Sequence, residues 1–256
     1  MMAILGVQMF TLREFTQNEE DLAATLRRVR DMGYRSIQIS AFGPIPAGRI
    51  QQLCADMDLD IAATHVSWDR LQSELDLVIE EHLLWNCRHT AVGMIPPEQY
   101  LSRSGLAQFL VEAEPVIVGL QAAGISFSYH NHRHEFQHFD GQTWLQALLQ
   151  RAPDINLNLE LDTHWIVAGG ADPVDWINKA GSCMPLLHLK DFRLDNENRR
   201  RFAAVGQGNL NWVDILAEAE KHPIKYYLVE QDNCYGEDPF ECLSQSFEFL
   251  SGFGLS

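Results

Sequence analysis

Eight short apolar runs recur along the chain at near-regular intervals, and this recurrence constrains the fold more than any other feature of the sequence. Each run is rich in apolar and β-branched residues, is shorter than an ordinary helix, and is followed by a longer amphipathic stretch. Successive runs end about 25 to 41 residues apart, close to the ~30 residues of one strand-plus-helix unit. The predicted strands are residues 4–8, 36–40, 61–65, 90–94, 125–130, 155–161, 185–189 and 226–230.

The stretches between these runs carry helix signals. After the first run, Leu22, Leu26 and Val29 recur at helical spacing, with Asn18 as the expected N-cap and Gly33 as the expected stop. An Asp-Pro pair at 172–173 opens a later helix with a cap residue followed by a first-turn proline. The predicted helices are residues 19–32, 105–123, 211–221 and 239–250, together with the one that begins at 172.

Eight strand-then-helix units in 256 residues predict an α/β protein with a (β/α)8 TIM barrel, and we expect residues 1–256 to form a single domain. A doubly wound open sheet is the structural alternative. Such sheets usually have fewer strands, and the Gly-x-Gly-x-x-Gly turn that often follows their first strand is missing here.

The charge of the chain excludes several classes of partner. Thirty-five acidic side chains against nineteen basic ones give a net charge of −16. A general nucleic-acid binder needs clustered Lys and Arg for the phosphates, and an anionic membrane surface attracts the same residues. We therefore expect a small-molecule ligand, and no nucleic acid or membrane as a partner.

Targeting signals and disulfide patterns are weak. Residues 1–8 place no positive charge before their short apolar run, so we expect a first strand rather than a signal peptide. No stretch approaches the roughly 18 apolar residues of a membrane span. The five cysteines are scattered without a Cys-x-x-Cys pair, which indicates neither a disulfide framework nor a zinc ribbon. A reducing cytoplasm is the expected setting.

Polar side chains stand at the ends of the last four predicted strands. In a (β/α)8 barrel the active site lies at the carboxyl ends of the strands, so polar residues there are candidates for chemistry. The fifth run ends in a His-rich stretch that also contains Glu135, and the next three end in Asp162, His188 and Glu230. Three carboxylates and one imidazole from four neighbouring strands would suit an octahedral Mn²⁺, Mg²⁺ or Co²⁺ ion. Because thiolates are missing from these strand ends, a structural Zn²⁺ site is not indicated.

Each of these groups also has a structural interpretation. The histidines between 130 and 138 could belong to a solvated loop. Separately, one of Glu160 and Asp162 could face the barrel while the other faces the helices. Asp162 and Glu230 could form ion pairs with Lys190 or Arg193. A purely structural role for the whole set is disfavoured, because buried charge without a metal or a function is costly.

Six motifs together resemble the xylose-isomerase-like TIM-barrel superfamily, in the branch called sugar phosphate isomerase/epimerase. They are YHNHRHEF (129–136), LELDTHW (159–165), GGADPVDWI (169–177), HLKDF (188–192), VGQGNLNW (205–212) and VEQD (229–232). The resemblance covers nearly the whole chain. Relatives in that superfamily include ketose 3-epimerases, inosose dehydratase and inosose isomerase, with endonuclease IV as a more distant member.

The resemblance implies one divalent metal ion, with Mn²⁺ expected and Mg²⁺, Co²⁺ and Zn²⁺ as alternatives. Its ligands would be Glu135, Asp162, His188 and Glu230, and it is the resemblance that selects Glu135 over the neighbouring histidines. His132 is a second candidate after the fifth strand, as a ligand or a substrate contact.

The sequence departs from the ketose epimerases at one position. Those enzymes carry a substrate-binding His three residues after the strand-six Asp, where this chain has Trp165, and His164 stands one residue earlier. The substrate pocket therefore need not be that of a ketose epimerase.

A metal-dependent sugar isomerase or epimerase is the function that these features predict. Proton abstraction next to a sugar carbonyl would pass through a metal-stabilised enediolate, with Glu135 and Glu230 as acid–base groups on opposite faces of the substrate. The alternative is a lyase of the same superfamily, either an inosose-type dehydratase or an enzyme that eliminates an aglycone from a 3-keto-glycoside. The net charge of −16 disfavours a DNA-repair nuclease.

A second group of residues is expected to bind the sugar. His65, His132, Trp165 and Lys190 are the predicted substrate contacts, and the alternative for Lys190 is an ion pair with Asp162 or Asp191. Gln8 could bind a hydroxyl, and Phe10 and Trp68 could provide apolar faces or pack between helix and barrel. The Arg run at 199–201 is interpreted as solvated, so a phosphorylated substrate is not predicted. A homo-oligomer is an open alternative to a monomer.

Overall fold

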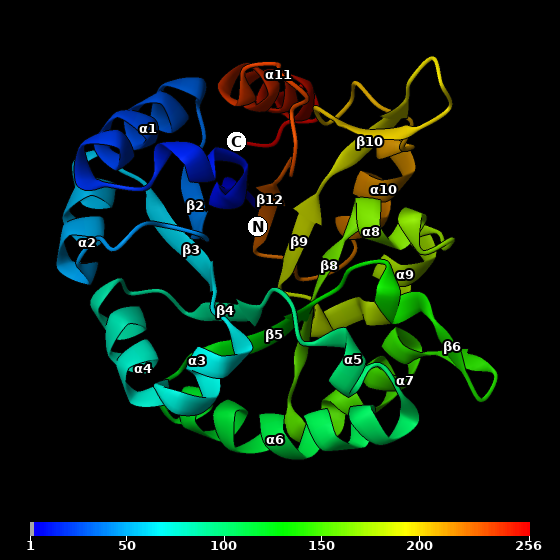
Figure 1. Cartoon of the computed structure of the whole chain (residues 1–256). Coiled ribbons are helices and arrows are strands. Elements are labelled where there is room, and N and C mark those ends of the chain that lie inside the picture. The colour runs from blue at the N-terminus through cyan, green and yellow to red at the C-terminus, as the bar shows by residue number, and fades with distance from the viewer. Residues whose placement is uncertain (1–2) are drawn as a thin grey trace.

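Eight parallel strands form a closed barrel at the centre of the molecule, and helices surround it (Figure 1). The structure is a computed structural model, and it describes residues 3–256. Going round the barrel, the strands follow the order β1-β12-β9-β8-β5-β4-β3-β2, so that the first and last strands pair and close the sheet. The predicted (β/α)8 TIM barrel is confirmed. The strands are β1 (Ile4–Gln8), β2 (Ser36–Ile39), β3 (Asp60–His65), β4 (His89–Val92), β5 (Ser126–His130), β8 (Asn158–Asp162), β9 (Leu186–Leu189) and β12 (Tyr226–Val229).

Seven of the predicted strands agree with the structure to within two residues at each end. The start of the sixth strand was predicted wrongly at residue 155. Ile155 instead ends a short 3-10 helix, η3 (Ala152–Ile155), and Asn156 adopts the left-handed conformation with φ of 55°. Because this left-handed residue caps the 3-10 helix and departs from extended backbone, strand pairing begins only at Asn158.

Helices lie outside the strands and form a ring around the barrel (Figure 1). They are α1 (Glu19–Met32), α2 (Ala47–Asp56), α3 (Trp68–Ser73), α4 (Leu75–Leu84), α5 (Pro97–Tyr100), α6 (Arg103–Ala122), α7 (Trp144–Arg151), α8 (Thr163–Ala168), α9 (Pro173–Ala180), α10 (Trp212–Ala219) and α11 (Pro239–Ser251). Further 3-10 helices are η1 (Met9–Phe15), η2 (His134–Phe136) and η4 (Gly181–Cys183). Within residues 3–256, none of the helices combines the length and the apolar character needed to cross a bilayer.

Helix α1 illustrates how local sequence sets an element. The side chain of Asn18 accepts a hydrogen bond from the N–H of Asp21 at 3.0 Å, and Gly33 ends the helix with a φ of 111°. Leu22, Leu26 and Val29 are fully buried on one face. The predicted cap, stop and apolar face of this helix are therefore confirmed.

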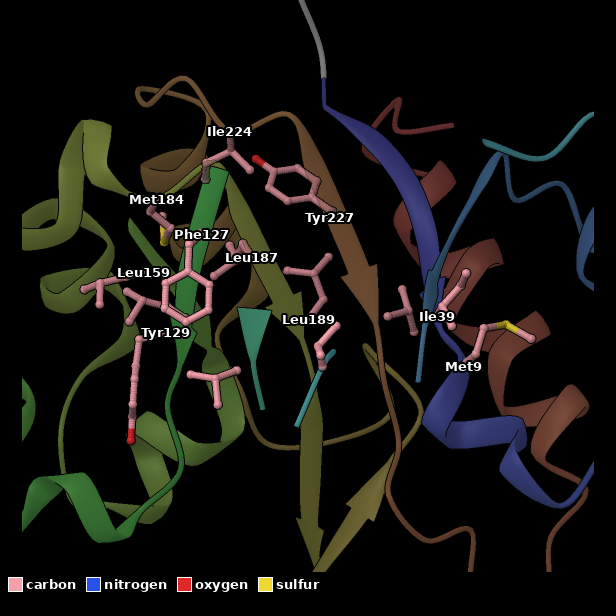
Figure 2. Close-up of a cluster of buried hydrophobic side chains, with 14 of the residues drawn as sticks. Met9, Ile39, Phe127, Tyr129, Leu159, Met184, Leu187, Leu189, Ile224 and Tyr227 are labelled. Carbon is pink, nitrogen blue, oxygen red and sulfur yellow. The ribbon is translucent and has the colours of Figure 1, made fainter. Parts of the chain in front are cut away.

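Alternation along the strands divides the barrel into an outer and an inner surface. Phe127, Leu159 and Leu187, on the neighbouring strands β5, β8 and β9, belong to the buried cluster between barrel and helices (Figure 2). Burying each such side chain contributes about 1.5–3 kcal/mol. A second, small cluster that includes Leu186 and Leu228 fills the amino-terminal end of the barrel interior. The polar residues of the interior therefore gather towards the carboxyl ends of the strands.

Two hairpins extend the barrel near its carboxyl end. One is formed by β10 (Asp191–Leu194) and β11 (Arg200–Ala203), and the other by β6 (His138–Phe139) and β7 (Gln142–Thr143).

Asp191 connects the β10–β11 hairpin to the segment that follows it. Burial raises the pKa of this carboxyl, while the donors around it favour its ionised form. A Cβ on Gly208 would lie 2.2 Å from Asp191 Oδ1, so glycine is needed there for the close approach. The carboxylate accepts five hydrogen bonds, from the N–H groups of Phe192, Gly206, Gly208 and Leu210 and from Trp212 Nε1.

Candidate active site and metal centre

A cavity of about 660 Å³ opens at the carboxyl ends of the strands. Its size lies in the range of ordinary small-molecule sites. Phe10, Met94 and Trp165 contribute apolar parts of the wall. The polar part is formed by His65, His130, His132, His134, Lys190, Glu230 and Asp232, among others. A ligand here would meet apolar surface on one part of the wall and several titratable groups on another.

Strand geometry explains why so many polar groups converge here. Residues two apart on a strand share a face, so Glu160 and Asp162 on β8 both point into the barrel, and both are fully buried. The interpretation in which only one of these acids faces the interior is therefore wrong. The same rule carries His188 and Lys190 inward together at the end of β9.

Glu160 forms the centre of a deeper layer of polar side chains in the barrel, which also contains Gln8, Gln38, His65 and His188. Its Oε2 lies 2.5 Å from His65 Nε2 and 3.3 Å from His188 Nε2, and its Oε1 accepts a hydrogen bond from Gln38 Nε2 at 2.7 Å. Burial alone would raise the pKa of this carboxyl, but the charges of His188 and His65 outweigh burial and hold it well below its usual value. Gln8 Nε2 donates to Gln38 Oε1 at 2.9 Å, which places Gln8 inside this network.

Lys190 forms the centre of a second polar layer nearer the barrel mouth, which also contains Asp162, Glu230 and Asp232. Its Nζ lies 3.1 Å from Asp162 Oδ2, 2.9 Å from Glu230 Oε2 and 2.8 Å from Asp232 Oδ1. Burial opposes the ammonium charge, but the three carboxylates outweigh it and raise the pKa of Lys190. The structure thus contains the ion pair between Lys190 and Asp162 that was considered from the sequence. Asp191 instead accepts hydrogen bonds from the hairpin and from Trp212.

The three carboxylates of this layer differ in their titration. Burial raises the pKa of Asp162, and Lys190 opposes that rise. Glu230 has a pKa well below its usual value, because Lys190 and His188 outweigh its burial. Burial and the neighbouring charge of Glu230 raise the pKa of Asp232 to about 7. Asp232 can therefore hold or release a proton near neutral pH.

His188 joins the two layers. Its Nδ1 lies 3.0 Å from Glu230 Oε2, and its Nε2 lies 2.8 Å from Gln38 Oε1. Burial opposes its positive charge, but Glu160 and Glu230 raise its pKa to about 10. The imidazole is therefore held in place from both sides.

Four residues at the barrel mouth could hold a metal ion. His130, Asp162, His188 and Glu230 each offer one ligand atom, and these atoms all lie within 4.8 Å of one another. Among residues 3–256, the buried His130 Nδ1 has no hydrogen-bond partner, and the buried Asp162 Oδ2 makes no hydrogen bond of good geometry, although Lys190 Nζ lies 3.1 Å from it. Two imidazole nitrogens with two carboxylate oxygens suit a first-row divalent ion. The residues present therefore fit the expected group.

Glu135 lies outside this set. It belongs to η2, where its Oε1 accepts from Tyr129 Oη at 2.8 Å and its Oε2 accepts from the N–H of His132 at 2.9 Å. It is grouped with His132 and His134 in a separate candidate cluster. Glu135 is fully buried, whereas Glu230 lines the cavity. In the four-residue set, the residue from the fifth barrel strand is His130.

The predicted substrate contacts all line the cavity: His65, His132, Trp165 and Lys190. The ring of His132 packs 5.2 Å from that of Trp165, and burial lowers the pKa of His132 to about 4, so it is neutral at pH 7. Phe10 also lines the cavity. Trp68 instead packs against Phe109 and donates its Nε1–H to Tyr100 Oη at 3.0 Å, which is the packing role considered for it.

Sequence reasoning missed three residues of the site: His130 as a ligand candidate, Glu160 as the centre of the deeper layer, and Asp232 in the cavity wall. A signal for each was present. His130 is the last residue of β5, and Glu160 and Asp232 each stand two residues from an identified site residue. Alternation along the chain therefore pointed to all three.

The arginine run lies on the β10–β11 hairpin. Arg199 and Arg201 both form ion pairs with Asp195, at 2.9 and 3.0 Å. This arrangement is the surface role expected for the run.

Solved structures of known proteins share the fold of this chain. No protein-family model matches the sequence, and no curated protein matches it significantly. Among solved structures, a sugar phosphate isomerase/epimerase from Parabacteroides distasonis superposes with a TM-score of 0.81 at 22% identity, covering 98% of both chains. The chain shares the TIM-barrel fold of that structure.

Two further structures of similar fold carry different named activities. An L-ribulose 3-epimerase superposes with a TM-score of 0.76 at 17% identity, covering 99% of this chain and 95% of its own. A probable 3-DHS dehydratase from Bacillus anthracis, involved in petrobactin synthesis, gives 0.73 at 13% identity, covering 98% and 99%. At these identities the likeness is one of fold.

Proposed function

We propose that this protein is a divalent-metal-dependent sugar isomerase or epimerase that moves a proton next to a carbonyl group. One observation carries the proposal: His130, Asp162, His188 and Glu230 converge beside a cavity of about 660 Å³. When bound there, a divalent ion would supply Lewis-acid stabilisation of the enediolate charge. The fold likeness to an L-ribulose 3-epimerase is consistent with this chemistry. Manganese is the ion we propose.

Acid–base groups reach the cavity from two sides. His132 follows β5 and Glu230 follows β12, and these strands are separated by β8 and β9 around the barrel. His132 is neutral at pH 7, and its Nδ1 has no hydrogen-bond partner within the described chain. We propose that His132 serves one face of the substrate, and that Glu230 serves the other.

Proton return decides the product. A proton taken from the carbon next to the carbonyl and returned to its opposite face gives an epimer, whereas return to the neighbouring carbon gives an aldose–ketose isomer.

Glu135 enters the proposal as a positioning residue, because it does not line the cavity. Its carboxylate accepts hydrogen bonds from the backbone N–H of His132 and from Tyr129 Oη, and these two bonds connect the loop after β5 to the strand. His65, Trp165 and Lys190 are the proposed substrate contacts, with the Trp165 ring offering an apolar face to a sugar.

A lyase is the second candidate. Elimination of a hydroxyl or an aglycone would begin with the same proton abstraction next to a carbonyl, so the same metal site and base would serve it. The fold likeness to a dehydratase supports keeping this alternative.

Isotope exchange separates these functions. Manganese-loaded protein, dilute enough to limit line broadening, would be incubated in D2O with free ketoses, inososes and 3-keto-glycosides and followed by proton NMR. Deuterium next to a carbonyl together with a new epimer or isomer is the expected result. Loss of a hydroxyl or an aglycone would move the protein to the lyase class.

Substitution tests the proposed residues. Glu230→Gln should lower the exchange rate by about 10²-fold or more, the range for removal of an acid–base group. Glu237→Gln is the matched control, because Glu237 follows the same strand but is exposed and pairs with Arg193. Equal rates in the two variants would remove Glu230 from the mechanism.

A further inference from the structure

Lys190 places a positive charge where a metal ion would need negative ligands. Its side chain is only 2% exposed, and its Nζ contacts Asp162 Oδ2 and Glu230 Oε2. Both of these residues belong to the four-residue metal set, whereas Lys190 does not. The ammonium and a divalent ion would therefore share two of their carboxylate partners.

The second oxygen of Asp162 does not resolve this conflict. Asp162 Oδ1 caps helix α8 by accepting the N–H of Trp165 at 2.8 Å. The oxygen left for an ion is Oδ2, the atom that Lys190 contacts at 3.1 Å. Two cations at one buried carboxylate oxygen repel each other strongly, because little water screens them.

Asp232 offers the ammonium another partner. It lies 2.8 Å from Lys190 Nζ, it is not part of the metal set, and its side chain is 21% exposed at the cavity wall. The Trp165 ring lies 5.3 Å from Nζ and the Phe202 ring 5.8 Å, both within the range of cation–π attraction. Lys190 can therefore give up Asp162 and Glu230 and still keep a carboxylate and two aromatic neighbours.

We propose that the Lys190 ammonium competes with a divalent ion for Asp162 and Glu230, and that Asp232 holds the ammonium when the ion binds. The inference rests on the metal site of the proposed function. It makes metal affinity a property of the Lys190–Asp232 pair as well as of the ligands. Removing Lys190 should therefore strengthen metal binding, although it removes contacts from the site.

Manganese binding to the purified full chain tests this directly, by the electron paramagnetic resonance signal of free Mn²⁺ and by titration calorimetry. Lys190→Met should lower the dissociation constant for Mn²⁺ by about tenfold or more, since a charge close to two ligand oxygens is gone. Lys225→Met is the matched control: it removes the same charge at the amino end of β12, where Lys225 is exposed, and should bind like the wild type.

Asp232→Asn should change the affinity for Mn²⁺ in the opposite direction. With its third partner weakened, Lys190 stays on Asp162 and Glu230, so Mn²⁺ should bind more weakly than in the wild type. In the Lys190→Met background the same substitution should have a clearly smaller effect, because the competing ammonium is absent. An equal effect in both backgrounds would show simple charge loss and would overturn the role of Asp232.

The outcomes separate the inference from the function on which it rests. If Lys190→Met binds Mn²⁺ no more tightly than the wild type, the competition does not exist. If neither the wild type nor any variant binds Mn²⁺, the proposed metal site itself fails. Should Lys190→Met fold poorly alone, refolding that requires Mn²⁺ would support the inference, and refolding indifferent to Mn²⁺ would overturn it.

Discussion

Asp191 should be among the most sensitive positions of the fold outside the apolar core. It is fully buried and accepts five hydrogen bonds, which connect the start of the β10–β11 hairpin to the segment before α10. Its Oδ1 accepts the N–H groups of Phe192 and Leu210, and its Oδ2 accepts the other three donors. Asp191→Asn keeps the shape of the side chain but replaces one acceptor oxygen with a donor NH₂.

The magnitude follows from the geometry. In the better orientation of the amide, the NH₂ takes the place of Oδ1, and two buried donors lose their acceptor. Each unsatisfied buried donor costs about 1–3 kcal/mol, so the variant should lose about 2–6 kcal/mol of unfolding free energy. That is a large share of the 5–15 kcal/mol typical of a folded domain.

Urea unfolding followed by far-ultraviolet circular dichroism measures this loss. Asp154→Asn is the control, because Asp154 is 60% exposed and makes an ion pair with Arg151 at the surface. The control should stay within about 0.5 kcal/mol of the wild type. A loss below about 1 kcal/mol for Asp191→Asn would refute the reasoning that these five donors depend on the carboxylate.

Three further predictions concern stability. Gly208→Ala places a Cβ 2.2 Å from Asp191 Oδ1 and should lower unfolding free energy by about 1–3 kcal/mol in the same urea assay; unchanged stability would contradict the close approach. Burial lowers the pKa of His89 to about 4, so the unfolded chain takes up a proton below pH 6.5 that the folded chain refuses. Stability should fall by about 3 kcal/mol from this group between pH 6.5 and 4, and His89→Gln should flatten that slope in urea titrations at each pH. Tyr129→Phe removes the donor to Glu135 and should cost about 1–3 kcal/mol by thermal unfolding, with no cost if the hydrogen bond is absent in solution.

The fold was predictable because its signal is spread over the whole chain. Eight apolar runs at near-regular spacing specify eight units even where single boundaries shift, as they did before β8. That shift arose at Asn156, whose left-handed conformation is a local backbone choice that the apolar pattern of 155–161 does not reveal. That residues 1–256 form one domain stays a prediction.

The convergence of the candidate residues was predictable where strand alternation decides it. Asp162, His188 and Glu230 meet because each stands at the inner face of a strand end. Glu135 was chosen from a family motif and stands five residues beyond the end of β5, where strand alternation no longer fixes the direction of a side chain. It is grouped with His132 and His134, and its role as a ligand stays a prediction. The identity of the ion depends on small differences in ligand geometry and remains a prediction.

Crystals soaked in Mn²⁺ and measured at the manganese absorption edge would test the central claim most directly. The account predicts one strong anomalous peak within bonding distance of His130, Asp162, His188 and Glu230. A peak at His132, His134 and Glu135 instead, or none at the barrel mouth in a saturated crystal, would contradict it.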